Sequence, residues 1–345
     1  MSFTQHKREA IKLYIMEKIA NGSAGLVAAV AESFSISDST VYRYLKEMET
    51  EGSICRDGKT YALTCTSKIY SFCRSEGELT DEDIVYDSIV AEEVENLPDN
   101  VFRIWKYAFS EMMNNAIDHS GAEHVQVEIR RSSLSMTIVI RDDGIGIFRN
   151  LQKHFGYRTP EEASLELFKG RLTTNPSKHS GEGIFFTSRT MDKFAVVSRG
   201  IVFSHDRFGV ITHQFTDAEL MAGWEEMEGT AVYMNLSNSS GRILKDVFDR
   251  YASVDDGFCR TSLPIRSMFD SYPVSRSQAK RLCRSIEVFS EVELDFDGVE
   301  EIGQGFAHEL FVVFAQAHPH MEIYPVNANR EVIRMIRHVA AGTGQ

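Results

Sequence analysis

Cysteine is scarce in this sequence, and the few thiols form no motif. The five cysteines include no CxxC pair, and an odd set of this kind argues against both a disulfide framework and a zinc site. Long apolar runs are also missing, since no stretch approaches the ~20 residues needed to span a bilayer. The first residues lack the apolar core and cleavage site of a secretory signal. We therefore expect a cytoplasmic protein with no membrane contact and reduced thiols at Cys55, Cys65, Cys73, Cys259 and Cys283.

Positive charge is in short supply as well, because the formal net charge is −13. The deficit is uneven. Residues 1–65 hold eight basic and eight acidic side chains, whereas residues 66–120 hold four basic and twelve acidic ones. The balanced segment can still meet a phosphate backbone locally, with modest and salt-sensitive affinity. A length of 345 residues with 43% hydrophobic content predicts a folded chain of two or three domains.

Residues 1–65 show the pattern of three helices followed by a hairpin. An amphipathic helix is predicted over about 6–20, an apolar helix over 26–34 and a third helix over 39–48. Ser37 or Asp38 is the expected N-cap of the third helix. An Asp-Gly pair at 57–58 then predicts the tip of a β-hairpin.

This order of elements, with the string SISDSTVYRYLKEMETEGSI, resembles a bacterial winged helix-turn-helix domain. In that arrangement Val41, Leu45 and Met48 face the core. The other face of the recognition helix is left to meet DNA, through Ser39, Thr40, Tyr42, Arg43 and Lys46. The alternative is a winged-helix module used for protein contacts or dimerisation.

Residues 66–97 are polar and acidic and are expected to form a connector. Pro98 ends it and opens a helix that runs to residue 119. Glu111 and Asn115 are four residues apart on this helix, so they share one face. A carboxylate and a carboxamide together suit a site that positions a water molecule and a divalent ion beside phosphates.

A glycine-containing turn follows two predicted strands, at 124–131 and 134–141. The second strand runs into a DxGxG motif made by Asp142, Gly144 and Gly146. The strand end leaves an acceptor carboxylate that can take an adenine amino group. The glycines let the backbone approach the base.

Two further motifs complete the pattern. After a long irregular stretch at about 148–180, Gly181 and Gly183 open another helix, whose free N–H groups can cradle phosphate. Later in the chain, Thr230 lies in a Gly-Thr pair at the start of a strand, and we expect it to reinforce the hydrogen bonding around Asp142.

The ordered set ExxxN, DxGxG, GxG and GT resembles the conserved boxes of the gyrase, Hsp90, histidine-kinase and MutL (GHKL) ATPases, and we place that domain at 98–240. The resemblance implies a Bergerat-type α/β sandwich that binds ATP with Mg²⁺. It implies Asn115 as the Mg²⁺ ligand, Asp142 as the adenine reader and the stretch 148–180 as a mobile lid. Glu111 matches the position that activates water or the phosphoacceptor. A P-loop or dinucleotide fold is set aside, because no GxxxxGK[ST] occurs and no GxGxxG follows a strand.

A third domain is expected at 260–345, after a linker at 241–259. Alternating strand and helix patterns predict a small α/β layer. The run LDFDGVEEIGQGFAHELF resembles the core of STAS domains, and more closely a STAS-like family (DUF4325) found fused to such ATPases. Phosphorylatable STAS domains carry a serine before the helix, whereas residues 302–306 here hold no Ser or Thr. This difference leaves a docking or sensing role, with a protein partner.

We thus expect an α/β chain (α+β overall) that acts as an ATP-binding, ATP-hydrolysing transcription regulator, in which nucleotide state controls DNA or partner binding. One alternative is a protein kinase of the anti-sigma-factor or histidine-kinase type. Of the histidines, only His205 and His308 precede an acid, and neither lies in a helical hairpin before the ATPase; His119 belongs to the nucleotide helix. Another alternative is a nucleotide-dependent scaffold without turnover. Related regulators and ATPases often act as dimers, so a homodimer is also expected.

Overall fold

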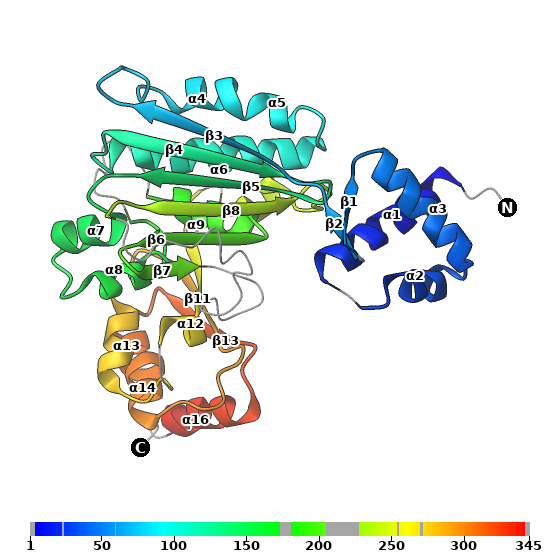
Figure 1. Ribbon diagram of the computed structural model, residues 1–345. Helices are drawn as coiled ribbons and strands as arrows, with labels where there is room; N and C mark the ends of the chain where they lie inside the picture. The colour runs from blue at the N-terminus through cyan, green and yellow to red at the C-terminus, as the bar shows by residue number, and fades with distance from the viewer. Residues whose placement is uncertain are drawn as a thin grey trace.

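The computed structural model describes residues 4–22, 24–58, 60–172, 181–204, 228–253, 255–269 and 272–341. Along the chain its elements form an N-terminal group, a central sheet with its helices, and a C-terminal group (Figure 1). Within these ranges no helix combines the length and the apolar character that crossing a bilayer requires.

The N-terminal group has three helices and a hairpin with a core of its own. Ile11, Ile15, Val30 and Val41 are fully buried in a cluster separate from the rest of the apolar core. The third helix starts as expected, because Ser37 Oγ accepts a hydrogen bond from the Thr40 N–H at 3.4 Å. The elements are α1 (Gln5–Ala20), α2 (Leu26–Phe34), α3 (Asp38–Thr50), β1 (Ile54–Asp57) and β2 (Thr60–Leu63).

The central sheet has six strands in the order β3-β4-β5-β8-β6-β7, and every neighbouring pair is antiparallel. Alternate residues of the strands, such as Val127 and Ile138, face the main core. The strands are β3 (Thr66–Cys73), β4 (His124–Arg131), β5 (Ser135–Asp142), β6 (Lys193–Ser198), β7 (Ile201–Ser204) and β8 (Ala231–Ser237).

The helices of the central part pack their apolar stripes into that core. The longest, α6, buries Ile104, Trp105 and Phe109 completely, as its apolar residues recur on one face. The helices are α4 (Glu82–Ile89), α5 (Ala91–Val94), α6 (Asp99–Asp118), α7 (Ile147–Phe155), α8 (Pro160–Glu166) and α9 (Gly183–Thr190).

Three stretches are more ordered than the sequence indicated. Residues 66–97, expected to be a connector, supply the edge strand β3 and the helices α4 and α5, and Tyr86 of α4 packs on Phe109 of α6 with ring centroids 5.9 Å apart. The stretch 148–180, expected to be irregular, contains α7 and α8, and its last residues, 173–180, lie outside the described ranges. The expected linker 241–259 contains α11 (Leu244–Tyr251), β9 (Ala252–Ser253) and β10 (Gly257–Phe258).

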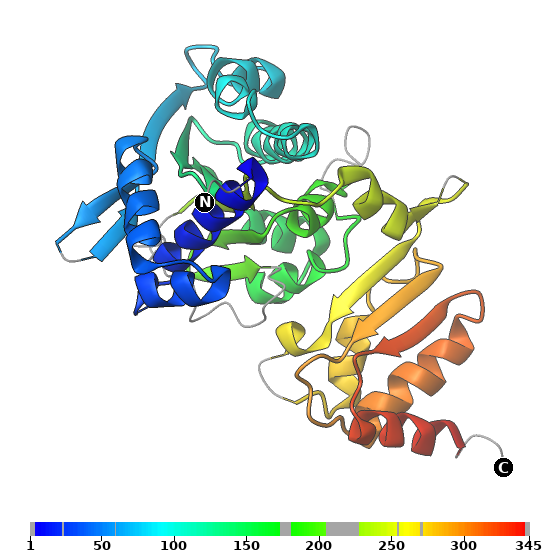
Figure 2. The same ribbon diagram turned by 90° about the vertical axis from the view of Figure 1, so that its right-hand side faces the viewer.

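The C-terminal group is a three-stranded parallel sheet in the order β11-β12-β13, with helices between its strands. In Figure 2 its yellow-to-red strands lie side by side with helices packed beneath them, far from the blue N-terminal group. The elements are β11 (Arg260–Pro264), α12 (Ile265–Met268), α13 (Arg276–Cys283), β12 (Glu291–Asp295), α14 (Gln304–His308), the π-helical η2 (Glu309–Phe314), α15 (Ala315–Ala317), β13 (Glu322–Val326) and α16 (Arg330–Ala341). The main apolar core runs without a break from the central part into this group.

Candidate nucleotide-binding site

A cavity of about 320 Å³ opens between α6, α7, the chain after α8, the start of α9 and the ends of β5 and β8. Its wall combines polar groups from several elements with apolar side chains from α6, α7 and β8, which is typical of a ligand pocket. Six of the residues predicted from the sequence meet in this wall, namely Glu111, Asn115, Asp142, Gly181, Gly183 and Thr230.

Asp142 lies at the end of β5 with its carboxylate held by backbone groups. Its Oδ1 accepts hydrogen bonds from the Gly144 N–H at 3.0 Å and the Thr230 N–H at 3.2 Å. Burial raises the pKa of this carboxyl to about 6, although the bonds from Gly144 and Thr230 oppose the rise. A carboxylate that faces a cavity and keeps acceptor capacity suits a ligand with an amino group.

Thr230 joins three parts of the site, as the sequence indicated for its bonding to Asp142. Its carbonyl accepts the Asp142 N–H at 2.9 Å, and its Oγ1 accepts the Ile147 N–H at 3.0 Å at the start of α7. Before it, Gly229 stands so close that a Cβ there would lie 1.8 Å from the Asp142 carbonyl oxygen. The Gly-Thr pair therefore needs glycine because β8 enters directly against β5.

Gly144 and Gly146 shape the turn behind Asp142 but do not line the cavity. A Cβ on Gly144 would lie 2.2 Å from the Ser120 carbonyl oxygen, so the turn can pack on the end of α6 only without a side chain. Gly146 has a φ of +81°, in the left-handed region that glycine adopts readily. Their close backbone approach is to protein groups, and the expected approach of this turn to a base stays a prediction.

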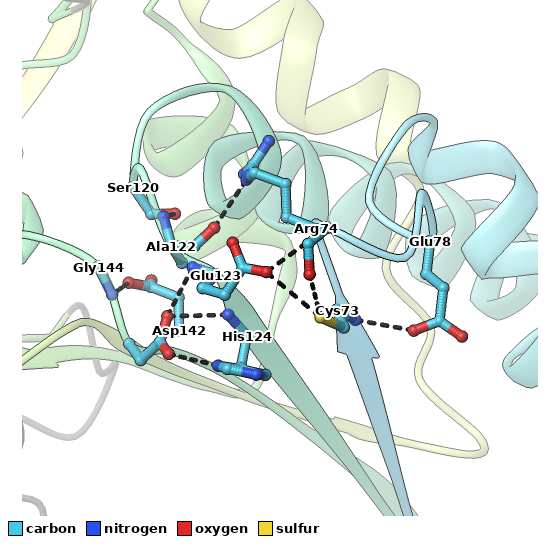
Figure 3. Close-up of polar contacts among 11 residues, drawn as sticks. Cys73, Arg74, Glu78, Ser120, Ala122, Glu123, His124, Asp142 and Gly144 are labelled. Carbon is cyan, nitrogen blue, oxygen red and sulfur yellow. Dashed lines mark hydrogen bonds and ion pairs between the residues drawn. The ribbon is translucent and has the colours of Figure 1, made fainter.

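The turn is fixed from its outer side by a polar cluster at the ends of β3 and β4 (Figure 3). Asp143 accepts hydrogen bonds from the backbone N–H groups of Glu123 and His124, both at 2.9 Å, and contacts His124 Nδ1 at 2.8 Å. Arg74, from the stretch expected to be a connector, donates to the carbonyls of Ile117 and Ala122, both at 2.7 Å. The cluster therefore holds the end of α6 against the Asp142 turn.

Glu111 and Asn115 face the cavity from α6, on the shared helical face that the spacing predicted. Glu111 lies against the start of α9, because a Cβ on Gly183 would stand 2.1 Å from Glu111 Oε2. One turn earlier, burial raises the pKa of Tyr107 well above its usual range, and the charges of Glu111 and Glu182 add to the rise. A neutral hydroxyl group therefore lies near Glu111 throughout the physiological pH range.

The N-terminus of α9 opens into the cavity through Gly181, Gly183 and Ile184. Among the described residues no side-chain cap bonds this end, and the first N–H groups of a helix, which lack partners within it, suit an anion. Gly181 has a φ of +74°, and a Cβ on it would lie 2.7 Å from the backbone of Leu172. Close backbone packing therefore requires glycine at position 181, whereas at position 183 a Cβ would meet only the Glu111 side chain.

Sequence reasoning missed several lining residues. Asn150 of α7 donates its side-chain amide to the His119 carbonyl at 3.1 Å, and both Asn150 and Asn114 line the cavity. Leu167, Gly170 and Leu172, from the chain after α8, close another side. No spacing rule marks these residues, because they reach the site through the packing of α7 and α8 and not through a motif.

The residues predicted to meet DNA lie on the outer face of α3, away from this cavity. Ser39, Tyr42, Arg43 and Lys46 are exposed, and Thr40 is half-buried. The most apolar of them, Tyr42, has 55% of its surface exposed to solvent. The core residues of the same helix, Val41, Leu45 and Met48, are buried as the pattern predicted.

Comparison with protein families identifies two domains. Residues 87–202 match the histidine kinase-like ATPase domain, and residues 278–332 match the STAS-like domain of unknown function (DUF4325). The chain therefore carries a histidine kinase-like ATPase domain followed by a STAS-like domain, and both resemblances are confirmed. A search of curated proteins found no match. A domain of the first class implies nucleotide binding, usually with Mg²⁺.

The cavity fits such a ligand. It has an anchored carboxylate at one side, Asp142, and the N-terminus of a helix at Gly183. Glu111 and Asn115 lie on the helix that borders both. The side-chain oxygen of Asn115 is a hard donor of the kind that Mg²⁺ prefers.

Proposed function

We propose that this chain is an ATP-binding and ATP-hydrolysing transcription regulator in which the nucleotide state controls binding to DNA or to a protein partner. The observation that carries the proposal is that Asp142, Glu111, Asn115 and the start of α9 line the same cavity. An adenine acceptor, a metal ligand, a proton acceptor and an anion site are the parts that a nucleotide hydrolase needs.

In this proposal each group has one task. Asp142 accepts the adenine amino group, while the Gly144 and Thr230 N–H groups keep the carboxylate oriented. The N–H groups of α9 hold the phosphates. Asn115 would hold Mg²⁺, and the ion would supply positive charge beside the phosphates. Glu111 takes the proton of the attacking water as the P–O bond to water forms and the bond to ADP breaks.

The first test uses γ-labelled ATP and Mg²⁺, with free phosphate and protein-bound label followed in one reaction. Glu111→Gln keeps the size of the side chain and should lower phosphate release about 100-fold or more with ATP still bound, since a general base contributes at least that much. Asp142→Asn should weaken binding itself. Phosphate release that is unaffected by both variants would contradict the assignment.

The same reaction tests a protein kinase, the second candidate. His308 of the STAS-like domain precedes Glu309, and its Nδ1 is a buried ring nitrogen that has no hydrogen-bond partner among the described residues. An imidazole in this state can act as a nucleophile towards phosphorus if the site opens. Label on protein that disappears in His308→Gln would favour the kinase over the hydrolase. ATP binding with neither product would favour a scaffold.

The N-terminal group and the STAS-like domain are the parts proposed to bind DNA and a protein partner. The exposed face of α3, with Tyr42, Arg43 and Lys46, supports contact with DNA phosphates and bases. The STAS-like domain supports docking of a protein partner, because its loop before α14 lacks a phosphorylatable side chain. Nucleotide-dependent retention on DNA fragments tests the first output. A light-scattering mass measured with and without ATP tests the expected homodimer.

A further inference from the structure

The chain between α8 and residue 172 has two opposite faces. Leu167, Gly170 and Leu172 line the nucleotide cavity. Lys169, between them, is only 1% exposed, and its ammonium group lies in the STAS-like domain. One short segment thus contacts both the nucleotide site and the domain whose role is unassigned.

The ammonium group of Lys169 caps a helix of that domain. Nζ donates to the carbonyl oxygens of Arg281 at 3.1 Å and Arg284 at 2.6 Å, at the C-terminal end of α13. The last carbonyls of a helix lack partners within it and favour a cation. Glu166 Oε1, at 2.7 Å, balances the buried charge. Thr261 Oγ1 of β11 donates to the Lys169 carbonyl at 2.9 Å, so both ends of the residue are tied to the STAS-like domain.

A second buried cation, on α9, also connects the ATPase domain to the STAS-like domain. Arg189 is 9% exposed and donates through Nη2 to the Ser262 carbonyl of β11 at 3.0 Å. Its guanidinium lies 3.3 Å from the ring centroid of Phe185, which also lines the cavity. Gly183 begins this helix, so the element proposed to hold the phosphates is bonded directly to the STAS-like sheet.

An outer ion pair adds to these contacts. Arg284 Nη1 lies 3.6 Å from Glu162 Oε2 of α8. The result is a clamp, which we define as Glu162, Glu166 and Lys169 on the ATPase side with Arg281 and Arg284 on the STAS-like side. Burying a charged pair carries a desolvation cost that an apolar contact of equal size would avoid. The clamp therefore provides direction and specificity to the contact, beyond what simple anchoring requires.

We propose that the STAS-like domain senses nucleotide through this clamp. Filling the cavity displaces residues 167–172 and α9, and Lys169 and Arg189 transmit the displacement to α13 and β11. This inference rests on the proposed function in one respect, that the cavity binds nucleotide. The coupling is reciprocal, so a protein partner that binds at α13 changes the affinity for nucleotide by the same factor.

Hydrogen exchange of the whole chain, with and without Mg·ATP, tests the inference. The variant Glu166→Gln/Lys169→Met removes both charges together and so leaves no unpaired buried ion. Its control is Glu331→Gln/Arg334→Met, an exposed ion pair of the same three-residue spacing on α16. Protection at 142–147 and 181–190 reports nucleotide binding. A change in protection at 276–284 reports the response of the STAS-like domain to nucleotide.

In the wild type and the control, ATP should slow exchange at 276–284 by about 5-fold or more, a coupling of ordinary size. In the clamp variant the change there should fall below about 2-fold, while protection at 142–147 persists and shows that the protein is folded and binds ATP. The inference is overturned if ATP slows exchange at 276–284 in the clamp variant as much as in the wild type. It is also overturned if ATP protects 142–147 in the wild type but does not change exchange at 276–284. Absence of protection at 142–147 in the wild type contradicts the proposed function itself and the coupling with it.

If the clamp variant does not bind ATP, Glu162→Gln provides the deciding measurement. It removes the outer ion pair with Arg284, keeps a side-chain oxygen that can accept the Arg158 N–H, and leaves Lys169 in place. The response at 276–284 should then be reduced but still present. A response equal to that of the wild type would overturn the inference.

Discussion

At the scale of single residues, the strongest feature is the buried carboxylate of Asp142, because burial disfavours its ionised form. Asp142 is 7% exposed, and burial raises its pKa from 3.8 to about 6. The backbone bonds from Gly144 and Thr230 lessen this penalty without removing it. A chain selected for stability alone would carry a neutral side chain here, so the charge points to a ligand that needs it.

The first prediction is that Asp142→Asn stabilises the nucleotide-free protein. Asparagine keeps an acceptor for the two N–H groups and carries no charge. Because the folded-state pKa is raised, the favourable contribution of Asp142 is present below pH 3.8 and is lost as the pH rises through about 6. The variant should therefore gain up to about 3 kcal/mol over the wild type at pH 7.5 and nothing at pH 3.5. Thermal melts across this range measure the difference.

Asp143→Asn is the control for that experiment. Burial opposes ionisation there too, but the hydrogen bonds from His124 and Glu123 outweigh it and hold the pKa of Asp143 below its usual value. Its substitution should lower the melting temperature at pH 7.5. Equal and same-signed shifts for the two variants would show that burial of Asp142 is not the cause.

The second prediction concerns the pH dependence of binding. The ionised form of Asp142 is the better acceptor for an amino group, so ATP affinity should weaken as the pH falls through about 6. Asp142→Asn, which does not titrate, separates this effect from protonation of the nucleotide. Calorimetric titrations at pH 5 and pH 7.5 give the comparison. A parallel pH dependence in both proteins would rule out Asp142 as the group responsible.

At the scale of elements, the sequence predicted the helices and strands that have a local residue pattern. It missed those that form because of packing against other parts of the fold. The face of α6 that carries Glu111 and Asn115, and the strand ending at Asp142, follow from spacing alone. The edge strand β3 was missed because most of its residues are exposed, so no apolar alternation marks it. Helices α7 and α8 were missed because they are short and follow the glycines at 144 and 146, which favour a loop.

The third prediction contrasts two glycines at element starts. Gly183→Ala places a Cβ against the flexible end of Glu111, and alanine favours a helix, so stability should stay within about 1 kcal/mol of the wild type. Turnover should fall about 10-fold or more, because the displaced carboxylate no longer reaches the water. Gly229→Ala instead meets the backbone of Asp142 and should cost about 3 kcal/mol or more. Melting temperatures and phosphate release, measured on both variants, distinguish the two effects.

At the scale of the whole molecule, the apolar cores show which parts share packing. The ATPase and the STAS-like domain share one continuous core, whereas the N-terminal group has a separate one. The family resemblances indicated each of the later domains but not their contact. Lys169 carries no motif, and its partners are backbone carbonyls at 281 and 284, which a side-chain pattern cannot reveal. Only residues 64 and 65 separate β2 from β3, so the N-terminal group is joined closely to the edge of the ATPase sheet.

The last prediction tests whether this N-terminal group binds DNA. Arg43→Ala/Lys46→Ala removes two exposed cations from the outer face of α3 and substitutes none of its buried side chains. If both meet phosphates, the dependence of log affinity on log salt should flatten by about 2, and affinity at 100 mM salt should fall about 10-fold or more. Arg334→Ala/Arg337→Ala on α16 makes the same change in charge at the same spacing and should leave both values unaltered. Equal losses of DNA affinity in the two variants would show that the change in net charge alone causes the effect. No loss in the first variant would assign α3 to protein contacts, and the chain would then act on transcription only through a partner.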